Sequence, residues 1–152
     1  MKTRKNNKGF SLVELIVVVA IMAVLVGVLA PAYLKYVEKS RKSTDISAMA
    51  NVMEAMTISA SDIELNLANG DTMTAKWTND TVSFEATGSN STKVVDELNA
   101  ILGTVTLKSA DFKDGNGAIT GTVGADGKVT FTSSGNGDEM KAYSTDFAKK
   151  FS

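Results

Sequence analysis

An uncharged stretch from Leu15 to Leu34 constrains this chain more than any other feature. About 20 apolar residues in a helix are enough to cross the hydrocarbon core of a bilayer. The apolar run already begins at Phe10, so Glu14 lies near its start. A carboxylate at membrane depth costs roughly 2.5 kcal/mol or more unless it is paired. The stretch therefore predicts a long helix in which Glu14 either has a partner that compensates its charge or has a functional role.

Charge is segregated along the chain. Lys2, Arg4, Lys5 and Lys8 all precede Gly9, with no acidic residue among them. The formal net charge is −1, and without these four residues the remainder is clearly acidic. Affinity for nucleic acid comes largely from clustered Lys and Arg. No nucleic-acid partner is therefore expected.

Several kinds of catalytic chemistry lack their residues. The chain has no Cys and no His, which removes thiol nucleophiles, the familiar triads and the commonest zinc ligands. The one Gly-Lys pair, Gly127-Lys128, does not fit a phosphate-binding loop, because Val129 follows it and Thr122 stands where the first glycine belongs. We expect a chain that is not an enzyme and has no cofactor.

The N-terminal region has three interpretations. A secretory signal peptide would use Ala30-Pro31-Ala32 as its cleavage site, but its apolar segment would be unusually long and would contain Glu14. A plain single-span anchor fits the length. Its orientation stays open because Lys35, Lys39, Arg41 and Lys42 follow the span as closely as the leader charges precede it.

The third interpretation explains more residues. The segment Lys8-Gly9-Phe10-Ser11-Leu12-Val13-Glu14-Leu15 resembles the cleavage and methylation motif of type IV pilin precursors. In that family a short basic leader ends in Gly, Phe usually follows, Glu comes four residues after the Phe, and an uncharged run follows. The resemblance covers residues 1 to about 45.

The resemblance implies a defined course of maturation. A prepilin peptidase in the cytoplasmic membrane would cut between Gly9 and Phe10 and methylate the new amino group of Phe10. Glu14 would then meet the amino terminus of the neighbouring subunit and set the register of a homo-oligomeric helical filament. The other partners implied are an inner-membrane platform protein and an assembly ATPase. The precursor would have a cytoplasmic N-terminus and an external head, and would become a cell-surface pilus.

Pro31 interrupts the predicted helix. Proline lacks a backbone donor and clashes with the carbonyl four residues before it, which here belongs to Gly27. We expect Gly27 and Pro31 to mark a bend.

Beyond Pro31 the next strong stop signal is Asn69-Gly70-Asp71. We therefore expect a helix from Phe10 to about Leu67, about 87 Å long at 1.5 Å per residue. The spacing of apolar residues predicts that one face of its second half is buried. That face holds Met49, Val52, Met53, Met56, Ala60, Ile63 and Leu67.

The rest of the chain has short β-like runs. They are Thr72–Trp77, Thr81–Thr87, Thr104–Lys108, Ala118–Val123 and Lys128–Ser133. Thr92–Leu102 reads as a helix with Val94, Val95, Leu98, Ile101 and Leu102 inward, and Met140, Tyr143, Phe147 and Phe151 suggest a terminal helix. The predicted fold is α+β: a long N-terminal helix on a small antiparallel sheet, similar to the pilin fold. The expected regions are a leader at 1–9, a transmembrane half at 10–34, an amphipathic half at 35–68 and a β-rich head at 69–152.

One loop offers oxygen ligands. Asp111, Asp114 and Asn116 lie in a Gly-rich segment, and some secretion pseudopilins bind calcium in such loops. The segment lacks the spacing and the terminal Glu of an EF-hand, so a plain turn is the simpler interpretation.

The function expected from the resemblance is that of a type IV pilus subunit acting in adhesion or motility. A pseudopilin of a type II secretion or competence system shares the same N-terminal features. A membrane-anchored binding module, with the Gly9–Phe10 bond intact, is the alternative from another class.

Overall fold

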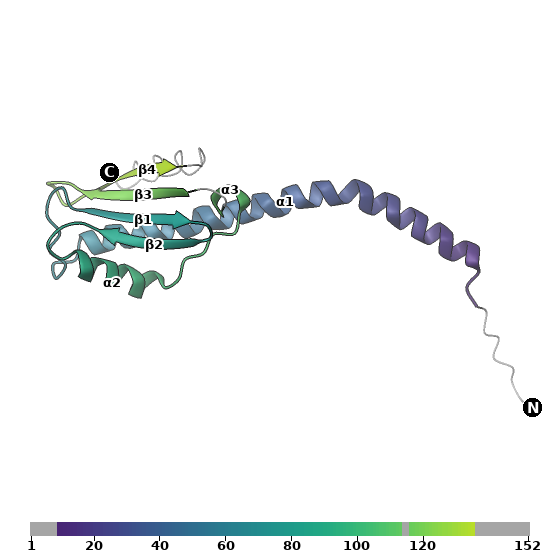
Figure 1. Cartoon of the computed structure of the whole chain (residues 1–152), viewed down its shortest axis with the longest axis horizontal. Coiled ribbons are helices and arrows are strands. Elements are labelled where there is room, and N and C mark those ends of the chain that lie inside the picture. Colours follow the sequence, from purple (N-terminus) through teal and green to yellow (C-terminus); the bar gives the residue numbers. More distant parts are fainter. Residues whose placement is uncertain (1–8, 114–115, 136–152) are drawn as a thin grey trace, which may run out of the picture. The chain divides into compact units, whose positions relative to one another are not determined.

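The computed structural model describes residues 9–113 and 116–135. Its elements, in chain order, are α1 (Leu12–Ala60), β1 (Thr72–Thr78), β2 (Thr81–Ala86), α2 (Ser91–Leu102), α3 (Ala110–Lys113), β3 (Asn116–Val123) and β4 (Val129–Gly135) (Figure 1). The chain divides into two units, Met1–Val37 and Glu38–Ser152. We call the second unit the head. The predicted α+β arrangement, a long N-terminal helix with a small antiparallel sheet, is confirmed.

Helix α1 begins at Leu12 and includes the whole uncharged stretch. By length and composition it could cross a membrane, and none of its most apolar window is buried inside the chain. The large apolar side chains from Leu12 to Leu34 are between 49% and 73% exposed. A contiguous apolar surface of this size on a soluble monomer would be unusual. An exposed apolar surface of this kind is typical of a segment that lipid or other protein chains cover.

The predicted end of the long helix at about Leu67 is wrong, since α1 ends at Ala60. The side chains that follow bond to nearby backbone instead. An Asp62 carboxylate oxygen accepts from the Glu64 N–H at 2.7 Å, and the N–H groups of Ser61 and Asp62 bond to carbonyls only three residues back, at 3.0 and 3.2 Å. Such local bonds compete with helix continuation. Ile63, predicted to be inward, is consequently 91% exposed.

The four strands form one antiparallel sheet in the order β2-β1-β3-β4. Asp126 and Gly127 lie in the turn between β3 and β4, as predicted, and Gly127 has a φ of 76° that favours glycine. Val129 and Phe131 are buried while Thr130 and Thr132 are exposed, which confirms the predicted alternation.

The core of the head lies between one face of the sheet and the second half of α1. Met49, Val52, Met53 and Met56 are fully buried, as their spacing predicted. They belong to one cluster with the inward residues of all four strands, which are Met73, Ala75, Trp77, Val82, Phe84, Ile119, Val123, Val129 and Phe131. Figure 1 shows this half of α1 running along one face of the sheet.

Helix α2 packs beside the sheet near β2 and completes the core (Figure 1). Val94 and Leu98 are fully buried, and Val95 and Leu102 are partly buried against them. The prediction for Ile101 was wrong, because that side chain is 45% exposed. A helix lying on a small sheet buries a narrower stripe than the five predicted positions cover.

The predicted strand Thr104–Lys108 is also wrong. The segment makes a single β-bridge, between Thr106 and Thr81, with backbone bonds from Val82 N–H to Val105 and from Leu107 N–H to Asp80. The next two backbone N–H groups, of Lys108 and Ser109, bond to a side chain of α1 instead. The segment therefore cannot continue as a strand.

The outer face of the sheet is polar. Thr74 and Thr120 hydroxyls hydrogen-bond across β1 and β3 at 3.1 Å, and Lys76 pairs with Glu85 across β1 and β2. The predicted terminal helix around Met140–Phe151 lies outside the described residues.

Gly117 pairs with Trp77 across β3 and β1, and the indole occupies the space of a side chain at position 117. A Cβ there would come within 2.1 Å of the Trp77 ring. Gly117→Ala is therefore expected to lower the free energy of unfolding by about 1–3 kcal/mol. Urea unfolding of the full chain in detergent, followed by the fluorescence of the single Trp, measures it. Thr132→Ala, on the exposed face of β4, is the control, with an expected change of at most about 0.5 kcal/mol. Equal midpoints for both variants would contradict the prediction.

Candidate functional site

The start of α1 has a defined cap. Gly9, Phe10 and Ser11 precede the helix, and the Ser11 carbonyl accepts the first helical hydrogen bond, from Leu15 N–H at 3.2 Å. The Glu14 carboxylate turns back and accepts the Ser11 N–H at 2.9 Å. Ser11 and Glu14 thus occupy the N-cap and third positions of the Ser-x-x-Glu capping-box pattern, and the bond from the Ser11 N–H to the Glu14 carboxylate is one of that motif's two bonds. The Glu14 carboxylate also lies where a helix dipole favours negative charge.

The structure places the predicted processing and assembly residues together. Gly9 and Phe10 have no regular secondary structure and lie directly before the cap, and both are exposed, Phe10 to 90%. Glu14 follows one helical turn after Phe10. The bond between Gly9 and Phe10 is therefore outside the hydrogen-bonded helix, as a proteolytic site requires.

Gly27 and Pro31 lie in the interior of α1, and the helix continues through both. Space around Gly27 is open, with nothing within 4 Å of an added Cβ apart from the local helix backbone. The glycine is thus not demanded by packing within this chain. The bend at Gly27 and Pro31 stays a prediction.

The candidate calcium residues are separated by secondary structure. Asp111 is in α3, Asn116 begins β3, and Asp114 lies outside the described residues. Within the described part of the chain, no group of three His, Cys, Asp or Glu residues is placed to hold a metal ion. Calcium binding by this segment stays untested.

Sequence reasoning missed the role of Ser11. The signal was available, because Ser-x-x-Glu before an apolar run is the capping-box pattern. One oxygen of Glu14 therefore caps the helix, whereas the predicted register role depends on the charge of the same carboxylate.

A second missed feature is a buried carboxylate on α1. Asp45 has no exposed surface, and its oxygens accept from Lys108 N–H at 2.9 and 3.0 Å and from Ser109 N–H at 2.7 Å. Two turns earlier, Glu38 accepts from Ala110 N–H at 2.6 Å. The Ser109 hydroxyl in turn accepts from Phe112 N–H at 3.3 Å and caps α3. We call Glu38, Asp45 and the bonded backbone of residues 108–110 the clamp.

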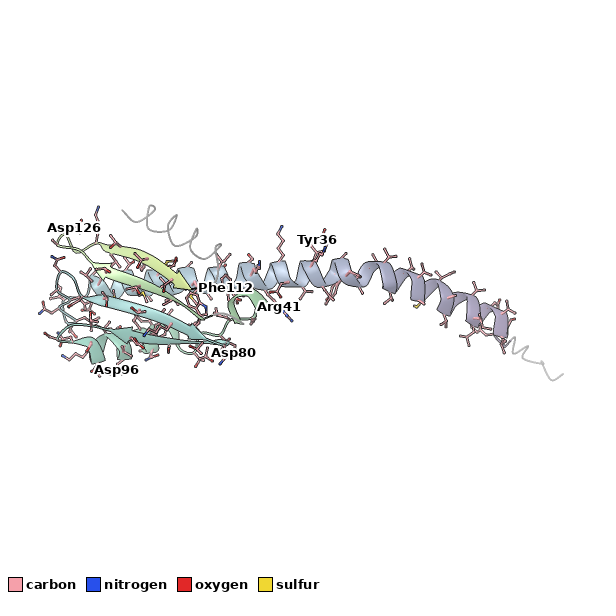
Figure 2. All side chains as sticks on the ribbon, turned by 45° about the horizontal axis from the view of Figure 1, so that its top comes forward. Tyr36, Arg41, Asp80, Asp96, Phe112 and Asp126 are labelled. Carbon is pink, nitrogen blue, oxygen red and sulfur yellow. The ribbon has the colours of Figure 1, made fainter. Side chains whose placement is uncertain are left out.

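The clamp joins α1 to the segment before α3 near the beginning of the head, where Figure 2 labels Phe112 and Arg41. A buried carboxylate is tolerated only when hydrogen bonds replace its hydration. The sequence signal was a charged residue four positions before Met49, on the stripe that is otherwise buried.

Comparison with known proteins agrees with these features. Residues 4–30 match the family described as "Prokaryotic N-terminal methylation motif". Two proteins from Pseudomonas aeruginosa, each named "Fimbrial protein", are 28% identical to this chain over 122 residues. The match covers 78% of this chain and 77% of each relative. No solved structure matches the chain.

The fold and the site define a class: a small α+β head carried on a helix whose exposed apolar half follows a methylation motif. The methylation motif at residues 4–30 and the similarity to fimbrial proteins support a type IV pilin family in the broad sense, which includes pilins and pseudopilins.

Proposed function

We propose that this chain is a structural subunit of a type IV pilus, cut after Gly9, methylated at Phe10 and polymerised into a surface filament that serves adhesion or motility. The observation that carries the proposal is the methylation motif over residues 4–30, joined to a helix whose apolar side chains are exposed from Leu12 to Leu34. Such a precursor would have both a processing signal and an apolar surface that lipid or other subunits cover.

The geometry suits a prepilin peptidase as the first partner. Gly9 and Phe10 lie outside the helix, and glycine lets the backbone take the extended form that proteases bind. Cutting this bond would leave a cationic amine on Phe10, one turn from the Glu14 carboxylate. Phe10 and Glu14 are four residues apart, which is the spacing at which groups on successive turns of a helix can meet.

In the membrane, the amine and Glu14 of one subunit would compensate one another in part. During assembly, Glu14 would instead meet the Phe10 amine of a neighbour. A buried charge pair is strongly dependent on geometry, so a subunit entering at the wrong height leaves a charge unmatched. Packing of the apolar half of α1 would supply most of the attraction, and Glu14 would set the register.

The other proposed partners follow from the family. An inner-membrane platform protein and an assembly ATPase would extract and add subunits. The precursor would lie in the cytoplasmic membrane with its N-terminus in the cytoplasm and its head outside. A type II secretion or competence pseudopilus would use the same N-terminal chemistry, and the relatives named fimbrial proteins favour the pilus.

Mass spectrometry of the mature chain tests the proposal. A chain that begins at N-methylated Phe10, recovered from fibres sheared off the cell surface, is the expected result. An uncut Met1, or a chain beginning at Tyr33 after signal-peptide cleavage, would overturn it. A different result would establish a pseudopilin: methylated Phe10 without surface fibres, together with loss of protein secretion or DNA uptake when the gene for this chain is deleted.

A further inference from the structure

One end of the head combines exposed isoleucines with carboxylates. Ile58 and Ile63 are 57% and 91% exposed, although removing an isoleucine side chain from water is favourable. Ile58 and Asp62 line one shallow depression, and Asp62 also lines the next, with Glu64, Asp96 and Glu97. We call Ile58, Asp62, Ile63, Glu64, Asp96 and Glu97 the acidic patch.

The acidic patch is a defined surface, because its two elements are tied together. The Asn90 side-chain amide, just before α2, donates to the Leu65 carbonyl in the segment after α1 at 2.9 Å. Leu65 and Leu98 are buried beneath it. Among the described residues that line the second depression, Lys93 is the one cation beside four carboxylates.

The other end of the head carries positive charge. Lys39 and Arg41 lie two residues apart on α1, both exposed, and we call them the basic patch. Its acidic neighbour, Glu38, lies 3.8 Å from the Arg41 guanidinium but already accepts the Ala110 N–H. Glu38 is 29% exposed and Arg41 is 53% exposed, so the cation is the more accessible of the two.

The two patches cannot pair within one head. The residues of α1 between Arg41 and Ile58 separate them by about 26 Å at 1.5 Å per residue. Figure 2 labels Arg41 and Asp96 at opposite ends of the head. At physiological salt, charges interact over about 8 Å. The acidic patch of one copy is therefore available to the basic patch of another.

We propose that the acidic patch of one subunit binds the basic patch of the next, with Ile58 and Ile63 covered at the centre of the contact. This inference rests on the proposed filament and adds a head-to-head contact to the packing of the apolar helices. Two different, complementary surfaces on one chain make a heterologous interface, which repeats into an open helical fibre when it does not close into a ring. Charge complementarity commits the acidic patch to a second copy of this chain.

Charge reversal tests the contact. One variant carries Glu64→Lys and Asp96→Lys, so that both ends of its head are basic. The other carries Lys39→Glu and Arg41→Glu, so that both ends are acidic. Each alone is expected to reduce sheared fibres on the order of tenfold or more, because like charges would face each other at every contact. Cells that produce both variants together are expected to regain fibres, since basic and acidic ends can alternate.

A matched control exchanges Lys76→Glu with Glu85→Lys on the outer face of the sheet, which reverses one pair without touching either patch. It is expected to assemble as the unaltered chain does. Processing at Gly9 and Trp fluorescence confirm that every variant is cut and folded.

The outcomes separate this inference from the proposed function. If the unaltered chain makes no fibres, the proposed function fails. If it makes fibres and both reversed variants do so at equal yield, the patch contact is overturned. Loss without recovery on co-production also overturns it. The basic-patch variant could instead be lost from the membrane fraction while the acidic-patch variant assembles normally. That result would show that Lys39 and Arg41 bind lipid headgroups, and it would also overturn the patch contact.

Discussion

Glu14→Gln is expected to leave a subunit that is cut after Gly9 and held in the membrane but forms fibres at least about 100-fold less efficiently. Leaving one charge of a buried pair unmatched costs about 3–5 kcal/mol, and each ~1.4 kcal/mol is a factor of ten. The measurement is the amount of chain in sheared fibres relative to the amount in membranes.

The choice of Gln separates the two roles of Glu14. Glutamine also serves at the third position of a capping box, so the bond to Ser11 N–H and the start of α1 should survive. Only the charge is removed. Asp126→Asn is the control, because it removes a carboxylate charge from the exposed β3–β4 turn while keeping an oxygen for the Lys128 N–H. Fibre yield from Glu14→Gln equal to that of Asp126→Asn would remove Glu14 from assembly.

Asp45→Ala is expected to lower the free energy of unfolding of the head by about 2–5 kcal/mol. The substitution leaves the N–H groups of Lys108 and Ser109 without their acceptor, and an unsatisfied buried donor costs about 1–3 kcal/mol. It also leaves a cavity beside Met49. Urea unfolding of the full chain in detergent, followed by Trp77 fluorescence, gives the change because Trp77 is buried in the head.

Two variants make the Asp45 test specific. Asp45→Asn keeps one acceptor oxygen and should lose less than Asp45→Ala. Glu38→Ala removes the more exposed member of the clamp, so it should cost about 1 kcal/mol or less. An unfolding midpoint for Asp45→Ala at or above that of Glu38→Ala would show that the buried carboxylate does not hold the clamp.

Much of the fold was predictable because its signals are local. The spacing of Met49, Val52, Met53 and Met56 predicted the buried face of α1, and alternation predicted the inward residues of β4. The wrong predictions concern the end of α1 and the segment that pairs briefly with the edge of the sheet. Helix α1 ends before the turn signal because the Asp62 carboxylate accepts the Glu64 N–H and the N–H groups of Ser61 and Asp62 bond only three residues back. At Thr104–Lys108, strand propensity was overridden because Asp45 takes the backbone donors that the strand would need.

Individual residues of the candidate site could be predicted where a single short motif contains them. Gly9, Phe10 and Glu14 occur within six residues, so their spacing could be read directly, and the same chain segment matches the methylation-motif family. The clamp had no such motif. Asp45 and Ser109 are 64 positions apart, and nothing in either segment identifies the other.

The amino-acid sequence by itself determined the methylation motif, the exposed apolar half of α1 and the type of fold. These depend on charge, hydrophobicity and helical or strand period, which are properties of neighbouring residues. Only the tertiary structure decided that Asp45 is satisfied by the backbone of residues 108–109, and that Asp62 and Asp96 share one end of the head. Those arrangements depend on which distant segments are brought into contact, because the energy of a buried polar group is set by the partner that folding places beside it.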